Sequence, residues 1–92
     1  MGWNGGGIKT CKIMIELKQT CAWCPEQYDA YSNGKIVGYL RLRSGRFTVE
    51  CPHVMGKLEF SHEFEDSRNE FDEAERDLFL QQAIKAIQAF YN

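Results

Sequence analysis

The sequence lacks the features that would mark a membrane, secreted or catalytic protein. No stretch approaches the roughly 18–20 consecutive apolar residues of a membrane helix. Residues 1–7 have neither the charged nor the apolar region of a secretion signal. The only two histidines, His53 and His62, stand in no pattern with serine, cysteine or carboxylates that matches an enzyme signature. We therefore expect a cytoplasmic protein that is not an enzyme and has no membrane partner.

The charge is small but unevenly distributed. The 92 residues carry a net charge of −2, which argues against general nucleic-acid binding. Positions 35–57 hold five basic residues and one acid, whereas positions 59–77 are dominated by acids. A chain of this length forms one domain with a thin core, so we treat 1–92 as a single domain.

Apolar and polar residues alternate along most of the chain before the acidic segment. We expect a flexible leader at 1–7, a β-sheet over 8–64 and a C-terminal helix over 70–91. A period of two predicts strands with one buried and one wet face. The clearest strand places four apolar side chains on one face: Cys11, Ile13, Ile15 and Leu17.

Asn33-Gly34 predicts the turn of a first hairpin, because both residues tolerate positive φ. A two-residue loop pairs Tyr28 with Tyr39, and a three-residue loop with Gly34 as a bulge pairs Tyr28 with Gly38. We prefer the second register because it places Tyr28 on the apolar face. The strand after the turn then has inward side chains at Ile36, Gly38, Leu40 and Leu42.

Ser44-Gly45 predicts a second hairpin with a two-residue turn. In this register Leu42 faces Phe47 and Arg41 faces Thr48, so both strands agree on which side is the core. A fifth strand over 56–64 follows. Its expected core face consists of Leu58, Phe60, His62 and Phe64, and the acids after it form a solvated loop.

The closing helix is expected to begin at a cap formed by Ser67 or Asn69, with Glu70 completing a capping box. Its main apolar stripe consists of Leu80, Ala83, Ile84, Ile87 and Tyr91. Three further apolar residues widen this stripe: Phe79, Ala86 and Phe90. Either the helix lies in a curled sheet, or the extra width contacts a partner subunit. The fold class predicted from these elements is α+β, an antiparallel β-meander of four to five strands packed by one C-terminal helix.

The cysteines raise the question of a metal site. Cys21 and Cys24 have the spacing of a zinc knuckle, and Cys51 with His53 supplies two more ligand types. The second pair is too tightly spaced for an easy ligand arm. We therefore expect unligated, mostly buried thiols and no cofactor, and keep a structural zinc module as an alternative.

The outer side of the second hairpin is the strongest candidate for a ligand site. Arginine is a planar, bidentate donor suited to phosphate and carboxylate, and a neighbouring aromatic ring can stack on a base. Alternation places one tyrosine, three arginines and a threonine on this side: Tyr39, Arg41, Arg43, Arg46 and Thr48.

Three segments resemble a loose set of short uncharacterised phage and prophage proteins. They are Cys24-Pro-Glu-Gln-Tyr28, Gly38-Tyr-Leu-Arg-Leu-Arg43 and Phe47-Thr-Val-Glu-Cys-Pro52, within a likeness over about 11–52 and a fainter one in the closing helix, 77–87. Such proteins often carry a second Cys-Pro-x-Cys arm, from which this chain departs at His53. The resemblance implies a counter-defence factor, which either inhibits a host protein or soaks up a nucleotide signal as a small oligomer.

The leading hypothesis is thus a binding protein that sequesters an anionic, nucleotide-like immune signal in the host cytosol, as a homodimer or higher homo-oligomer. A first alternative is an inhibitor that binds a host defence protein through its acidic 59–77 surface. The structural zinc module is the second alternative.

Overall fold

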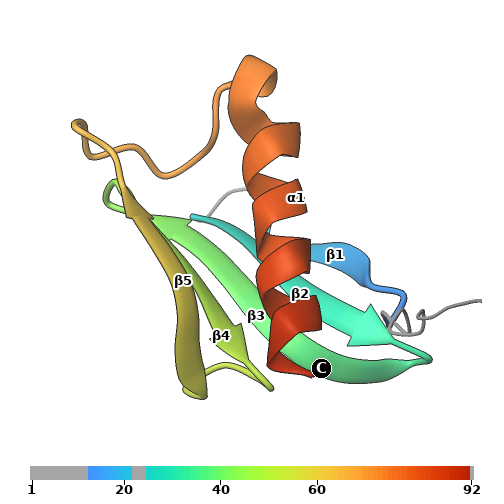
Figure 1. The fold of residues 1–92 in the computed structure, drawn as a ribbon. Helices are drawn as coiled ribbons and strands as arrows, with labels where there is room; N and C mark the ends of the chain where they lie inside the picture. Colours follow the sequence, from blue (N-terminus) through green and yellow to red (C-terminus); the bar gives the residue numbers. More distant parts are fainter. Residues whose placement is uncertain (1–12, 22–24, 92) are drawn as a thin grey trace, which may run out of the picture.

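The computed structural model describes residues 13–21 and 25–91. The expected leader, Cys11 and Cys24 lie outside these residues. Five strands precede one helix (Figure 1): β1 (Glu16–Cys21), β2 (Glu26–Ser32), β3 (Lys35–Arg43), β4 (Arg46–Cys51), β5 (Lys57–Glu63) and α1 (Glu73–Phe90). The strands form one antiparallel sheet in sequence order, and α1 crosses one face of it. The α+β meander with a C-terminal helix is confirmed. Within the described residues, no helix is both long and apolar enough to cross a membrane.

The β3–β4 hairpin has the predicted register. Ser44 and Gly45 form its turn with φ of 51° and 81°, the positive values that suit the twist of a two-residue hairpin loop. Leu42 pairs with Phe47 and Arg41 pairs with Thr48. The alternation therefore places the leucines inward and the arginines outward, as expected.

Next to its turn the β2–β3 hairpin has the register of the expected two-residue loop, with Tyr31 paired with Ile36, but beyond Val37 it has neither of the two expected registers. Its loop is the two-residue Asn33-Gly34 turn, but Val37 is an extra residue on β3, so that Tyr28 pairs with Leu40. Our preference for the Tyr28–Gly38 pairing was wrong, although Tyr28 is buried as that choice required. A bulge reverses the alternation beyond it. As a result Val37 is buried and Ile36, expected inside, is 45% exposed.

Because of a second bulge, one side chain of β5 lies on a different face from the expected one. Val49 pairs with Phe60 and Glu50 pairs with Leu58, which leaves Glu59 as the extra residue. Leu58 therefore shares the outer face with Glu50 instead of the core face with Phe60, and it is 47% exposed.

The helix begins later than expected. Asp72 is the N-cap residue and its N–H donates to the carboxylate of Glu75 at 3.1 Å, forming the capping box. The expected cap at Ser67 or Asn69 was wrong because Asn69 has other partners. Its side-chain oxygen accepts the N–H of Ser44 and its carbonyl accepts the N–H of Glu26, both at 2.8 Å.

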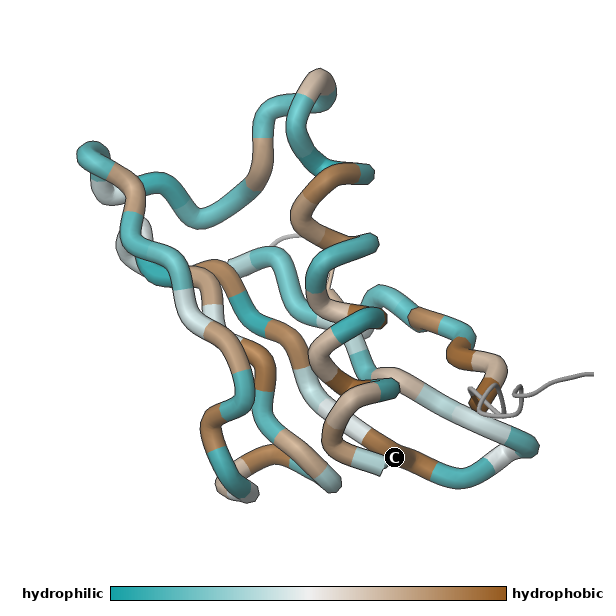
Figure 2. The backbone as a smooth tube through the Cα atoms, in the orientation of Figure 1, coloured by the Kyte–Doolittle hydropathy of each residue, from teal (hydrophilic) through white to brown (hydrophobic). Residues whose placement is uncertain are grey.

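The core lies between α1 and the curled sheet. Phe79, Ala83 and Ile87 are the buried helix residues, and Phe90 packs against the core from the flank of the stripe. Packing within one chain thus involves two of the three residues that widened the apolar stripe, Phe79 and Phe90. Figure 2 shows that apolar and polar segments alternate along the strands, whereas the chain between β5 and α1 is mostly polar.

An ion pair between a buried carboxylate and a half-buried guanidinium joins β2 to the start of the helix. The carboxylate of Glu26, 4% exposed, accepts the Nε–H of Arg76 at 2.8 Å, the N–H of Phe71 at 2.9 Å and the hydroxyl of Tyr28. Burial raises the pKa of Glu26, but these hydrogen bonds outweigh it and the net pKa lies below its ordinary value. Glu26 is therefore held as a carboxylate within the core.

Candidate functional site

Three cross-strand pairs form the outer face of the β3–β4 hairpin. Starting from the Ser44-Gly45 turn they are Arg43–Arg46, Arg41–Thr48 and Tyr39–Glu50. The inward neighbours Leu40 and Leu42 are fully buried, so the hairpin backbone is held by the core while these polar side chains point away from α1. All five predicted ligand-binding residues belong to this one face.

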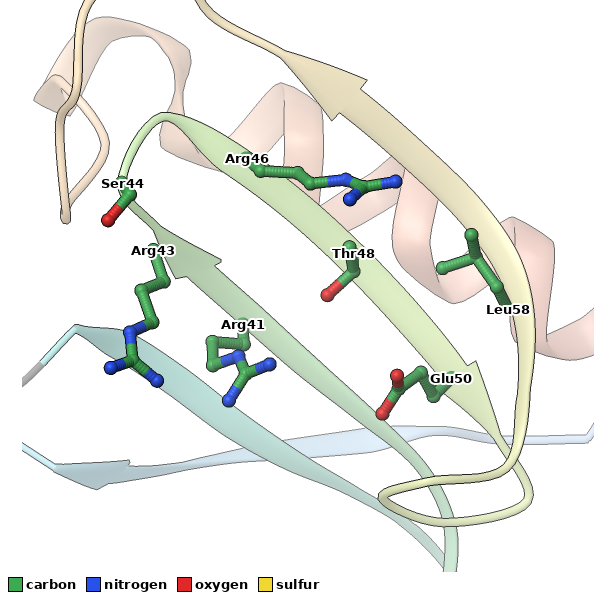
Figure 3. A pocket seen from close by; sticks show the side chains of 7 residues that line it. All are labelled: Arg41, Arg43, Ser44, Arg46, Thr48, Glu50 and Leu58. Carbon is green, nitrogen blue, oxygen red and sulfur yellow. The ribbon is translucent and has the colours of Figure 1, made fainter.

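A hollow of about 310 Å³ lies on this face (Figure 3). Its lining combines three arginines, two hydroxyl residues, one acid and one apolar residue: Arg41, Arg43, Ser44, Arg46, Thr48, Glu50 and Leu58. This volume is at the lower end of the range typical of small-molecule sites. Four of the five predicted residues line the hollow, and Tyr39 does not. The hydroxyl of Tyr39 donates to the side-chain oxygen of Gln27 on β2, and burial raises its pKa.

The arginines of the hollow differ in their ion pairing. Arg46 extends across β4 toward β5 (Figure 3), where its Nε lies 3.7 Å from the carboxylate of Glu63. Arg41 and Arg43 project together from β3 (Figure 3). Within residues 13–21 and 25–91, neither of these two makes an ion pair, whereas Arg46, Arg68 and Arg76 all do.

Three residues of the lining were missed from the sequence. Ser44 reaches the hollow because it belongs to the turn itself. Glu50 follows Thr48 by two residues, so the alternation would have placed it on this face. Leu58 reaches the outer face only through the bulge at Glu59, which no sequence signal indicated.

The cysteines do not fit the zinc alternative. Cys21 is disulfide-bonded, and Cys51, the other cysteine among the described residues, is free and fully buried. The expectation of free thiols was therefore wrong for Cys21. Burial, together with the charge of Glu59, raises the pKa of Cys51 to about 11. Zinc binds cysteine through free sulfur atoms, so a disulfide at Cys21 and a fully buried thiol at Cys51 count against this ligand set.

Of the two remaining proposed ligands, only His53 belongs to the described residues. Nδ1 of His53 lies 2.8 Å from the carbonyl oxygen of Val54, and Cys24 lies outside the described residues. In the described part of the chain, no cluster of three or more histidines, cysteines or acids has a geometry that could hold a metal ion.

The acidic segment after β5 is a solvent-exposed loop, as expected, and several contacts hold it in place. Arg68 pairs with the carboxylates of Asp66 and Glu75, and its guanidinium lies 4.2 Å from the ring centre of Phe64. The N–H of Gly45 donates to the carbonyl of Arg68 at 2.6 Å. These contacts fix the segment against the β3–β4 turn. Four acids of the segment are exposed and make no ion pair with the described residues: Glu65, Glu70, Glu73 and Asp77.

Comparisons of the chain with protein-family models, with curated proteins and with solved structures give no match.

Proposed function

We propose that this protein is a non-enzymatic binding protein that sequesters an anionic, nucleotide-like molecule in the hollow on the outer face of β3 and β4. The observation that carries the proposal is the pair of side chains Arg41 and Arg43. They point to the same open side two residues apart, and within the described part of the chain neither has an acid as partner.

Like charges on neighbouring guanidiniums repel one another, and an anion between them removes the repulsion. Arginine binds phosphate through two parallel N–H donors. The hydroxyls of Ser44 and Thr48 add donors on either side of these arginines. A phosphate-bearing ligand therefore matches the donor groups of the hollow.

Binding without catalysis is favoured by the chemistry of the lining. Among the described residues, the hollow is lined by neither histidine nor cysteine, and its one carboxylate, Glu50, accepts the N–H of Met55 at 3.0 Å. A sequestering protein needs affinity and no proton transfer. The resemblance to phage proteins supports the same role, counter-defence in the host cytosol.

We further propose that the protein acts as a homodimer or higher homo-oligomer. A hollow on one sheet face covers only one side of a ligand, whereas most small-molecule sites bury 70–90% of the ligand surface. A second subunit over the hollow would supply the missing wall. The mass of the native particle, measured with and without ligand, tests this part.

Thermal-shift and calorimetric titrations with ADP-ribose and cyclic dinucleotides test the binding proposal. We expect stabilisation of the wild-type protein and its loss in the Arg41→Ala/Arg43→Ala variant. The matched control is Lys85→Ala, which removes one exposed cation from the helix. Absence of binding at millimolar ligand, or equal binding by all three proteins, would refute the proposal. Because cytosolic thiols are kept reduced, the titrations are run with and without reductant, and binding must persist in both.

The four exposed acids that make no ion pair with the described residues favour one second candidate, an inhibitor that binds a basic host surface. Charge reversal at Glu65 and Glu70 should then abolish capture of one stoichiometric host protein, and salt should weaken the capture of the wild type. Capture that is unaffected by either change would exclude this candidate.

A further inference from the structure

The charge of the outer face changes sign along the β3–β4 hairpin. The pair nearest the turn, Arg43–Arg46, is doubly basic, whereas the third pair, Tyr39–Glu50, contains an acid. A strand rises about 3.3–3.4 Å per residue, so the first and third pairs lie roughly 13 Å apart. The hollow thus has a cationic end at the turn and a second end with different chemistry.

Glu50 is held in place at this second end. One of its carboxylate oxygens, Oε1, accepts the N–H of Met55 at 3.0 Å. Within residues 13–21 and 25–91, the other oxygen has no hydrogen bond or ion pair. Figure 3 shows the carboxylate beside Thr48, at the end of β4 away from the turn. An acid here repels a ligand that consists of phosphates alone, and it can accept hydrogen bonds from hydroxyl or amino groups.

Leu58 adds an apolar surface next to Glu50. The two residues are directly paired across β4 and β5, and both line the hollow. Leu58 is 47% exposed, because the bulge at Glu59 turns it outward, and the other residues that line the hollow are polar or charged. Ligand sites combine apolar surface with a few placed polar groups. The flat face of a nucleobase can lie on the leucine, and an amino group on its edge or a ribose hydroxyl can donate to the carboxylate.

We infer that the ligand is a nucleoside phosphate bound in one orientation. Its phosphates lie on Arg41, Arg43 and Arg46 at the turn, and its nucleoside part lies on Glu50 and Leu58. This inference rests on the proposed function and deepens it, since it specifies which class of anion binds and why bare phosphates bind less well.

Calorimetric titrations with two probes test the orientation: ADP and inorganic pyrophosphate. We expect ADP to bind at least about tenfold more tightly than pyrophosphate, the effect of one hydrogen bond to a charged group. Glu50→Gln and Leu58→Ser should each weaken ADP binding about tenfold. Neither substitution should weaken pyrophosphate binding. Arg43→Ala should weaken both ligands.

The controls separate this inference from the proposed function. Glu16→Gln removes an exposed acid on β1, outside the hollow, and should leave both affinities unchanged; circular dichroism shows that each variant is folded. Equal affinities for ADP and pyrophosphate, or a Glu50→Gln change that tightens both ligands alike, overturn the inference and preserve anion binding. No binding of ADP or pyrophosphate overturns the inference together with the proposed function.

Discussion

Arginines on the two sides of the sheet have different surroundings. On the helix-covered side, Arg76 is bonded to the buried carboxylate of Glu26. On the outer side, Arg41 and Arg43 have no acid as partner in the described part of the chain, although Glu50 lies on the same face. An acid was therefore available nearby but is not placed to neutralise them.

This difference separates charges that hold the fold from charges that are free to bind. A buried charge must be paired, because removing it from water without compensation is costly. An exposed guanidinium contributes little to stability, whether or not it forms an ion pair. Substitutions on the helix-covered side should therefore change stability, and substitutions on the outer side should change binding. The substitutions below test this difference, from the largest expected effect to the smallest.

The largest effect is expected for Arg76→Ala. The substitution leaves the Glu26 carboxylate, 4% exposed, without its cation, and breaking a buried pair in this way costs about 3–5 kcal/mol. The free energy of unfolding, from urea denaturation followed by far-UV circular dichroism, measures it. Arg43→Ala is the matched substitution on the outer side, where the side chain is exposed, and should change stability by less than about 0.5 kcal/mol. Similar losses in the two variants would remove the distinction.

The two hairpin turns offer a second contrast. Gly45 and Gly34 have nearly the same φ, 81° and 80°. A Cβ at Gly45 would lie 2.1 Å from the carbonyl oxygen of Asp66, whereas a Cβ at Gly34 would meet nothing within 4 Å. Gly34→Ala should cost only the strain of positive φ, about 1–2 kcal/mol, and Gly45→Ala should cost about 1–3 kcal/mol more because backbone must move. Equal losses of unfolding free energy would show that the acidic segment is not fixed against this turn.

A smaller effect is expected from acid titration of Glu26. Its folded-state pKa lies below the ordinary value of 4.5, so its contribution is complete above that pH and is lost as pH falls through the folded-state pKa. The melting temperature of the wild-type protein should therefore drop more steeply below pH 4.5 than that of Glu26→Gln, whose side chain does not titrate in this range. Parallel curves for the two proteins would assign the acid sensitivity to other carboxylates.

The sequence predicted the β3–β4 hairpin well because several signals agree there. A two-residue turn fixes the pairing, and strict alternation from Tyr39 to Arg43 fixes the faces. These two signals are enough to place Arg41, Arg43, Arg46 and Thr48 on one side of the sheet. The predicted site depends on this hairpin and on no long-range contact.

The bulges could not be predicted in the same way. Ile36 and Val37 are both apolar β-branched residues, so either can face the core, and only the pairing with β2 decides which one is buried. The position of Leu58 likewise depends on how β5 pairs with β4. The prediction of the helix cap was wrong for a related reason. Asn69 forms hydrogen bonds with Ser44 and Glu26, which are distant from it in sequence.

The smallest expected change in stability comes from one pair of arginines on the outer side of the sheet. Arg43 and Arg46 face each other directly across the hairpin, and like charges in opposite positions are destabilising by a few tenths of a kcal/mol. Arg43→Thr replaces one of them with a good strand former, so we expect about 0.2–0.5 kcal/mol of stabilisation at low salt.

Salt and ligand give the controls for this prediction. The gain should shrink in 0.5 M salt, because exposed charges are then screened over a few ångströms, and thermal melts at both ionic strengths measure it. Arg43→Lys keeps the charge and should give no gain. If Arg43→Thr instead destabilised the protein, Arg43 would be part of the fold, and its lack of an acid partner would no longer favour a ligand. A stabilised variant that has also lost ADP binding would mean that the outer arginines are kept at a cost to stability, as expected of residues that bind rather than support.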